Sequence, residues 1–189
     1  MWYIELRNYA EWYYTKYFPS TKKLQEKLFT KTGEAELVDR VMADLENLIV
    51  EKNVIESRVH GYLSQGKTAR YIRLNLVQKK FDSKIVNEVL AEKEDTIKNP
   101  ETYRLQIERI IKKGIQKWFS KRALSYELQM KYPDARGLVD ELLHDYDDPE
   151  ILQKKAPELL YKYSQEQVLS KLSQKGFQIS DIYTILRRR

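Results

Sequence analysis

The sequence predicts an all-α fold, and two observations support this. Apolar residues recur four positions apart along most of the chain, which is the spacing of the buried face of a helix. The pairs are Leu24/Leu28, Leu37/Val41, Ile72/Leu76, Ile85/Val89, Leu124/Leu128 and Val168/Leu172. Glycine and proline number only six and five in 189 residues, so the tight turns that antiparallel sheets need are poorly supplied.

Four segments of the chain resemble one another, at residues 24–42, 72–90, 124–142 and 168–186. Each has an apolar pair, a lysine three residues later, a break and a second apolar helix. Successive segments are offset by 48, 52 and 44 residues, and a step of that length holds three ordinary helices. We therefore expect an elongated, curved array of tandem three-helix repeats. The alternative is an irregular helical bundle in which the apolar pairs recur by chance.

The first module, residues 1–48, opens with a cluster of aromatic residues. The residues at helical spacing are Tyr9, Trp12, Tyr13 and Tyr17. We expect these four to close the core of the module, which leaves Trp2, Tyr3 or Tyr14 to stack on bases or on a partner protein. Gly33 suits the left-handed residue that follows a helix end.

The second module, residues 49–98, contains its own stop and start signals. Gly66 suits a turn between two helices, with Lys67 and Thr68 opening the next helix, and the Asp82 carboxylate can cap a third. Residues 61–68 also match the written pattern of a phosphate-binding P-loop. A working P-loop follows a buried strand, whereas residues 53–60 mix charges at helical spacing, so we favour the helical turn.

The third and fourth modules, residues 99–148 and 149–189, begin at proline-containing caps. Asn99 precedes Pro100, and we expect Asp148 to cap a helix that starts at Pro149. Residues 133–134 and Gly176 mark further breaks, and residues 164–167 form a capping box.

Positive charge is concentrated in one segment of the chain. The net charge is +6 and the isoelectric point is about 9.2. Residues 104–122 hold seven lysines and arginines and one acid, Glu108, so the rest of the chain is balanced. Such a segment is a candidate surface for an anionic partner, and its alternative is an ordinary solvated face.

Two groups of basic residues form the predicted interface. The first group steps by four along what we expect to be the outer ridge of one helix: Arg109, Lys113, Lys117 and Lys121, with Arg122 beside them. The second group lies around the middle helix of the second module: Lys67, Arg70, Arg73, Lys79 and Lys80. Contacts of this kind to the phosphates of single- or double-stranded DNA would depend on salt and not on base sequence.

Most of the chain resembles the regulatory protein RecX family, small basic modulators of the RecA recombinase. The first part of the resemblance runs from Tyr9-Ala10 to Lys31. The second includes residues 57–59, Gly66-Lys67-Thr68, residues 70–73 and 76–81, and the third is residues 171–177 with Ile182, Ile185 and Leu186. The resemblance is good over residues 9–90 and 160–187 and thin over 104–155.

The resemblance implies tandem three-helix units that bind in the groove of the RecA filament on DNA. It also implies suppression of ATP hydrolysis and strand exchange, and thus control of DNA repair and the SOS response. The alternative that the residues leave open is a sequence-independent DNA-binding helical protein without a recombinase partner.

Enzyme chemistry has few candidates in the sequence. The chain has no cysteine and two histidines, His60 and His144, far apart in the sequence. Residues 144–148 gather a histidine and three aspartates, which we interpret as a solvated loop and not as a metal site. We expect a non-enzymatic protein without cofactor or metal, monomeric and cytoplasmic, with no membrane segment.

Overall fold

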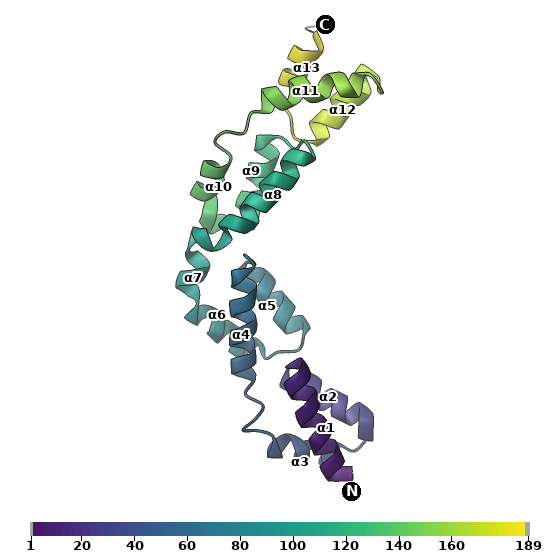
Figure 1. Cartoon of the computed structure of the whole chain (residues 1–189), viewed down its shortest axis with the longest axis vertical. Coiled ribbons are helices and arrows are strands. Elements are labelled where there is room, and N and C mark those ends of the chain that lie inside the picture. Colours follow the sequence, from purple (N-terminus) through teal and green to yellow (C-terminus); the bar gives the residue numbers. More distant parts are fainter. Residues whose placement is uncertain (1, 188–189) are drawn as a thin grey trace. The chain divides into compact units, whose positions relative to one another are not determined.

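The computed structural model describes residues 2–187, and all of their regular secondary structure is helical (Figure 1). The all-α prediction is therefore confirmed. The chain divides into two compact units, Met1–Ile97 and Lys98–Arg189. Within residues 2–187, each helix is too short or too polar to span a bilayer.

The elements follow one another without long connections. The first unit contains α1 (Trp2–Tyr17), α2 (Thr21–Thr32), α3 (Ala35–Asp44), α4 (Glu51–Ser64), α5 (Ala69–Gln78) and α6 (Ser83–Glu92), and α7 (Glu94–Lys98) ends at the boundary. The second unit contains the 3₁₀-helix η1 (Pro100–Tyr103), α8 (Arg104–Gln116), α9 (Lys121–Lys131), the 3₁₀-helix η2 (Pro133–Ala135), α10 (Arg136–Leu142), α11 (Asp148–Leu160), α12 (Gln165–Gln174) and α13 (Ile179–Arg187).

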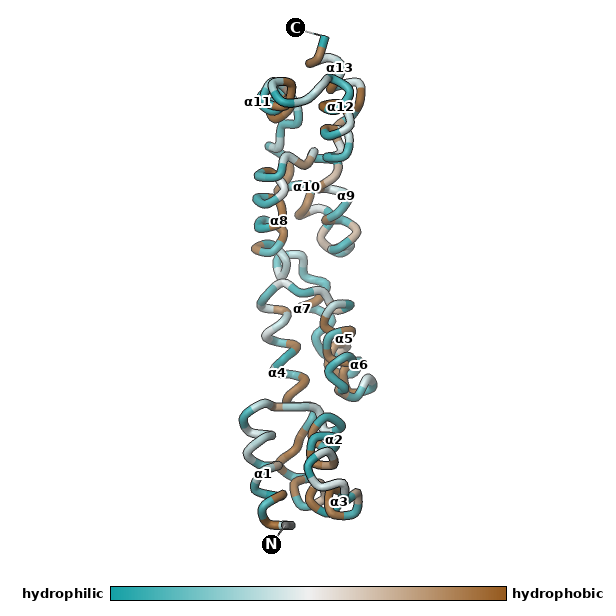
Figure 2. The backbone as a smooth tube through the Cα atoms, turned by 90° about the vertical axis from the view of Figure 1, so that its right-hand side faces the viewer, coloured by the Kyte–Doolittle hydropathy of each residue, from teal (hydrophilic) through white to brown (hydrophobic). Residues whose placement is uncertain are grey.

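Within each unit the α-helices contact one another in sets of three. The sets are α1–α3 and α4–α6 in the first unit, and α8–α10 and α11–α13 in the second. Figure 2 shows apolar and polar residues interleaved within single helices, as expected for helices that bury one side and expose the other.

The two units differ in their cores. In the first unit, buried side chains from α1 through α6 form one continuous core that includes Leu28 and Leu76. In the second unit, the buried residues fall into two clusters. One belongs to η1 through α10 and contains Leu128, and the other belongs to α11 through α13 and contains Leu172.

The middle helix of every set begins in the same way. The N-cap residues are Ser20, Thr68, Ser120 and Ser164. Each hydroxyl accepts a hydrogen bond from the backbone N–H three residues later, which satisfies a donor that the first turn of a helix leaves free. Residues four and eight positions after each cap are buried.

Within each unit, a buried serine cap bonds to the end of the next middle helix. In the first unit the Ser20 hydroxyl donates to the Lys79 carbonyl at 3.0 Å. In the second unit the Ser120 backbone N–H donates to the Lys175 carbonyl at 2.9 Å. Both serines are fully buried, and both lysines lie eleven residues after the cap of their own helix. We call these two contacts the serine joints.

Several predicted turn signals are confirmed. Gly33 and Gly176 have φ of 74° and 89°, and Gly66 lies between α4 and α5 with φ of 67°. The Asp82 carboxylate accepts from Lys84 N–H. The capping box at Ser164 is present in full, and Asn99 caps η1.

The predicted role of Asp148 is wrong. The helix α11 begins at Asp148 itself, and the preceding Asp147 makes no side-chain cap. The Asp148 carboxylate instead accepts a hydrogen bond from Lys121 N–H at 2.7 Å. A carboxylate twenty-seven residues away thus satisfies a free donor in the first turn of α9.

The predicted buried face of α1 is correct in part for Tyr9 and Tyr13 and wrong for Trp12 and Tyr17. The core side of α1 carries Leu6, Ala10 and Tyr14, of which Tyr14 is only 6% exposed. Trp12 and Tyr17 are about half exposed, at 49% and 48%, and Tyr9 and Tyr13 are partly buried. The core thus takes one large ring of α1, Tyr14, beside the small Ala10, and leaves Trp12 and Tyr17 at the surface.

The remaining aromatic residues near the start have other positions. Tyr3 packs partly against the core, and its hydroxyl donates to the Asp44 carboxylate. The side chain of Trp2 lies outside the described part of the structure. Neither Tyr3 nor Tyr14 is therefore free for stacking.

Candidate nucleic-acid and partner interface

The predicted basic ridge is divided between two helices. The helix α8 ends at Gln116, and Trp118 takes a left-handed conformation with φ of 56°. Lys117 is the C-cap of α8, whereas Lys121 and Arg122 begin the next helix, α9. The prediction of one continuous helical ridge is therefore wrong beyond Lys117, because this turn redirects the chain.

The outer face of α8 carries a group of three available cations. Arg109, Lys112 and Lys113 are exposed and lie opposite the buried Ile107 and Ile111. Their charged groups make no hydrogen bond or ion pair with any residue of the described chain. We call these three residues the α8 patch. Like charges this close repel one another, so an anionic partner would relieve that repulsion.

Cations next to this patch have structural partners. Arg104 pairs with Glu101 at 2.6 Å and with Glu141 at 3.1 Å, and the hydrogen bonds that its guanidinium donates to these carboxylates raise its pKa. The Lys121 ammonium donates to the His144 carbonyl. Of the predicted residues in the second unit, Arg109, Lys113, Lys117 and Arg122 are exposed and make no such contact within the described chain.

Three of the predicted residues in the first unit are held by side chains around them. Arg73 Nε donates to Asn87 Oδ1 at 2.8 Å. Lys79 Nζ donates to the Tyr62 hydroxyl at 3.0 Å, and Lys80 forms an ion pair with Glu26.

The two other predicted residues of the first unit are more available. Arg70 is exposed and makes no ion pair or side-chain hydrogen bond within residues 2–187. The Lys67 ammonium lies 5.2 Å from the centre of the Tyr71 ring.

Two exposed apolar side chains were missed by sequence reasoning. Leu74 is 63% exposed and Tyr126 is 70% exposed. Each lies six residues after the cap of its helix and four residues after an arginine, Arg70 or Arg122. Aligning the four middle helices on their caps would have found them, because residues at this position point away from the buried face.

The P-loop-like segment is the end of α4 and the turn that follows it. Gly61 through Ser64 belong to the end of α4. The backbone N–H groups of Gly66 and Lys67 donate to the carbonyls of Leu63 and Tyr62. These amides are therefore already used, whereas a P-loop needs them directed at phosphate.

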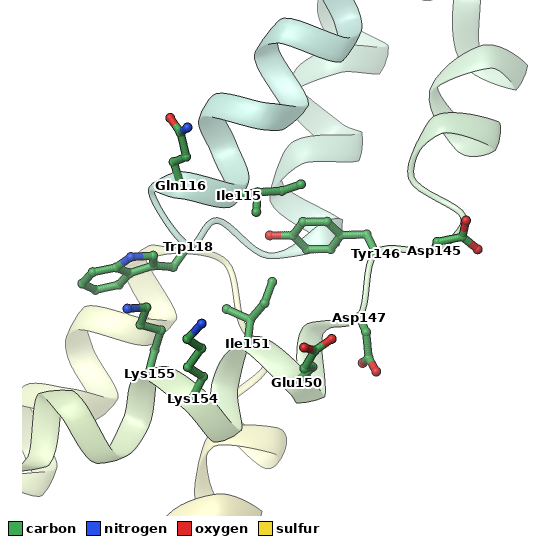
Figure 3. Close-up of a pocket in the computed structure, with 10 residues that line it drawn as sticks. All are labelled: Ile115, Gln116, Trp118, Asp145, Tyr146, Asp147, Glu150, Ile151, Lys154 and Lys155. Atoms are coloured by element: carbon green, nitrogen blue, oxygen red, sulfur yellow. The ribbon is translucent and has the colours of Figure 1, made fainter.

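The second unit contains an open pocket of about 420 Å³. Figure 3 shows Lys154 and Lys155 from α11 on the side of Trp118, and the carboxylates of Asp145 and Asp147 on the other side. The Lys155 ammonium lies 5.1 Å from the Trp118 ring and 2.6 Å from Glu158. The ammonium is thus neutralised locally and is not directed at a ligand.

Two contacts beside this pocket hold the connections between helices, and the second of them, made by Trp118, joins the two sets of the second unit. The Tyr146 hydroxyl donates to the Phe119 carbonyl, and burial, with a contribution from Asp148, raises its pKa to about 12. Trp118 packs against the core of α11–α13. In residues 2–187, including the His144–Asp148 stretch, no group of three His, Asp or Glu side chains is placed to hold a metal ion.

The chain matches no protein-family model, no curated protein and no solved structure in the three comparisons.

Proposed function

We propose that this protein is a RecX-like regulator that binds the RecA–DNA filament in its helical groove and inhibits ATP hydrolysis and strand exchange. The observation that carries the proposal is the family resemblance of residues 66–81. The segment spans the cap of α5, the exposed Arg70 and the buried pair Ile72 and Leu76. Such a protein would act in the cytoplasm as a monomer, without catalysis or cofactor, in the control of DNA repair and the SOS response.

The proposal includes an elongated, curved array of four tandem three-helix modules. Support comes from the four hydroxyl caps, which recur at steps of 48, 52 and 44 residues, and from the sets of three contacting helices. An array of this kind can touch several subunits of a filament at once. Individually weak contacts are then multiplied into tight binding.

The exposed residues suit two kinds of contact in such a complex. On α5 and α9 an arginine lies one turn from a large exposed apolar side chain, Leu74 or Tyr126, a combination typical of protein interfaces. The α8 patch carries positive charge and suits DNA phosphates.

A recombinase assay tests the proposal. Purified protein is titrated into RecA, single-stranded DNA and ATP, and hydrolysis, strand exchange and co-sedimentation are measured. We expect inhibition of both activities and co-sedimentation with filaments. Replacing Leu74 and Tyr126 together by glutamate should weaken inhibition, whereas Ser170→Glu at the equivalent position of α12 should not. Unchanged hydrolysis with no co-sedimentation rejects the proposal.

The α8 patch favours a second candidate function, sequence-independent DNA binding without a recombinase. It predicts salt-sensitive binding of the isolated chain to duplex DNA. Replacing Arg109, Lys112 and Lys113 by glutamine should reduce the slope of log affinity against log salt by up to about three, since each phosphate contact contributes roughly one. Absence of binding at low salt excludes this function.

A further inference from the structure

One side of α1 carries a row of four aromatic rings, of which Tyr9 and Tyr13 pack partly against the core and Trp12 and Tyr17 are about half exposed. The ring centres of Tyr9 and Trp12 are 5.8 Å apart, those of Tyr9 and Tyr13 are 6.0 Å apart, and those of Tyr13 and Tyr17 are 4.8 Å apart. The Trp12 and Tyr17 rings meet edge to face at 6.0 Å. We call these four residues the aromatic ladder.

Two lysines accompany the aromatic ladder. The Lys16 ammonium lies 4.8 Å from the Trp12 ring centre and 5.3 Å from that of Tyr17. The Lys31 ammonium, from α2, lies 4.1 Å from the Tyr9 ring centre. Neither lysine forms an ion pair with a carboxylate of the described chain. The rings therefore hold two positive charges at the surface that an anion can still approach.

The exposed half of the aromatic ladder, Trp12 and Tyr17, is not part of the core, which α1 joins through Leu6, Ala10 and Tyr14 and in part through Tyr9 and Tyr13. Half of the Trp12 and Tyr17 surfaces remain in water, although burying apolar area is the main driving force of folding. Aromatic rings beside cations are the combination that binds single-stranded nucleic acid, with bases stacked on rings and phosphates on ammonium groups.

We propose that the aromatic ladder is a binding site for single-stranded nucleic acid, independent of base sequence. From Tyr9 to Tyr17 the helix rises about 12 Å, which is room for two or three nucleotides at a spacing of roughly 3.4 Å or more. A duplex keeps its base faces stacked inside, so it cannot use the rings. The site does not depend on a recombinase, and it lies on a different unit from the α8 patch.

The test is the binding of fluorescein-labelled dT15 to the full chain, measured by anisotropy at low salt. Replacing both Trp12 and Tyr17 by alanine should weaken binding at least about fivefold, since a single base–aromatic stack accounts for that much. Trp12→Phe with Tyr17→Phe keeps two ring faces and should retain most of the affinity. Tyr161→Ala removes a tyrosine of the second unit that is 91% exposed and should change nothing.

Further measurements distinguish binding at the aromatic ladder from binding at other surfaces. A fifteen-base-pair duplex should bind the alanine variant as well as it binds the unaltered chain. Replacing the α8 patch by glutamine should weaken the binding of duplex and dT15 alike. Equal dT15 affinity of the alanine variant and the unaltered chain, with both folded by circular dichroism, overturns the proposal. An equal loss of dT15 affinity in the alanine and phenylalanine variants also overturns the proposal. A loss of duplex affinity in the alanine variant as large as its loss of dT15 affinity overturns it too.

Discussion

The two units contain the same serine joint but support it differently. In the first unit, Ser20 meets Lys79 beside one continuous core that runs from α1 to α6. In the second, Ser120 meets Lys175 between two separate cores. There the link is reinforced by Lys121 N–H on Asp148 and by the Lys175 ammonium over the Phe119 ring.

The difference shows which parts of the arrangement are constrained. Both joints place a buried serine cap at the start of one middle helix against the carbonyl at the end of the next, through the hydroxyl of Ser20 and the backbone N–H of Ser120. The surroundings of the joint differ between the units. A continuous apolar core lies beside the joint in the first unit, whereas polar and aromatic contacts reinforce the joint in the second. We therefore expect the first unit to unfold as one body, and the second to loosen one set of helices at a time.

The largest expected effect comes from truncating a core leucine in each unit. Leu76→Ala and Leu172→Ala each remove a fully buried side chain and should lower the free energy of unfolding by about 2–5 kcal/mol. In native-state hydrogen exchange, Leu76→Ala should weaken protection throughout α1–α6. Leu172→Ala should weaken it in α11–α13 and leave α8–α10 protected. Equal losses across the second unit would show that its two cores act as one.

The next largest loss of stability is expected at the residue twelve positions after the N-cap of a middle helix. In the second unit this is Gly176, at φ of 89°, and an added Cβ would lie 2.6 Å from both Ala123 Cβ and Ser120 Oγ. Gly176→Ala should therefore destabilise the second unit by roughly 2–3 kcal/mol, from backbone strain and overpacking. The measurement is urea denaturation.

The first unit provides the matched comparison. Its equivalent residue is Lys80, which has φ of 68° and an exposed side chain. Lys80→Gly removes left-handed strain and a surface ion pair, so it should change stability by less than about 1 kcal/mol. A loss as large as that of Gly176→Ala would mean that the first joint is packed as tightly as the second.

Removing each cap hydroxyl should have a smaller and unequal effect. The Ser20 hydroxyl both accepts from Lys23 N–H and donates to the Lys79 carbonyl, whereas the Ser120 joint uses the backbone N–H. Ser120→Ala should cost about 1 kcal/mol, the usual value of a cap. Ser20→Ala should cost about 2 kcal/mol because the partly buried Lys79 carbonyl also loses its donor. Thermal unfolding of the two variants measures the difference, and equal losses would contradict the proposed asymmetry.

The smallest effect is confined to alkaline solution. Burial raises the pKa of Tyr132 and Tyr146 to about 12, above the ordinary value of 10.0. The unfolded phenols ionise first, so the folded second unit should lose stability between about pH 10 and 12 and keep it below pH 10. Tyr132→Phe and Tyr146→Phe should each reduce this loss in unfolding curves. An unchanged pH profile would show that these hydroxyls ionise as freely as in the unfolded chain.

Much of the fold follows from local chemistry that the sequence displays. Apolar pairs four residues apart predicted the middle helices. Gly33 and Gly176 predicted the ends of two of them, and Gly66 the end of α4, because a left-handed turn favours glycine. Where a non-glycine residue takes that conformation, as Trp118 does, the break was missed. The predicted basic ridge was therefore placed on one helix that continued through this break.

The candidate site was harder to predict, because availability depends on tertiary contacts. Lys79 and Arg109 are both basic residues of predicted helices. The Lys79 ammonium donates to the Tyr62 hydroxyl, whereas the Arg109 guanidinium has no such partner in the described chain. The burial of Tyr14 and the exposure of Trp12 depend on which side of α1 its neighbours cover. Spacing alone does not distinguish two aromatic faces of one helix.

The most direct test of the proposed function is the rate of ATP hydrolysis by RecA filaments on single-stranded DNA as this protein is added. We expect the rate to fall to a saturating plateau as the protein binds to the filaments, and the Leu74→Glu/Tyr126→Glu variant to need more protein to reach it. A rate that stays constant at every concentration, with the protein left in the supernatant, would contradict the proposal.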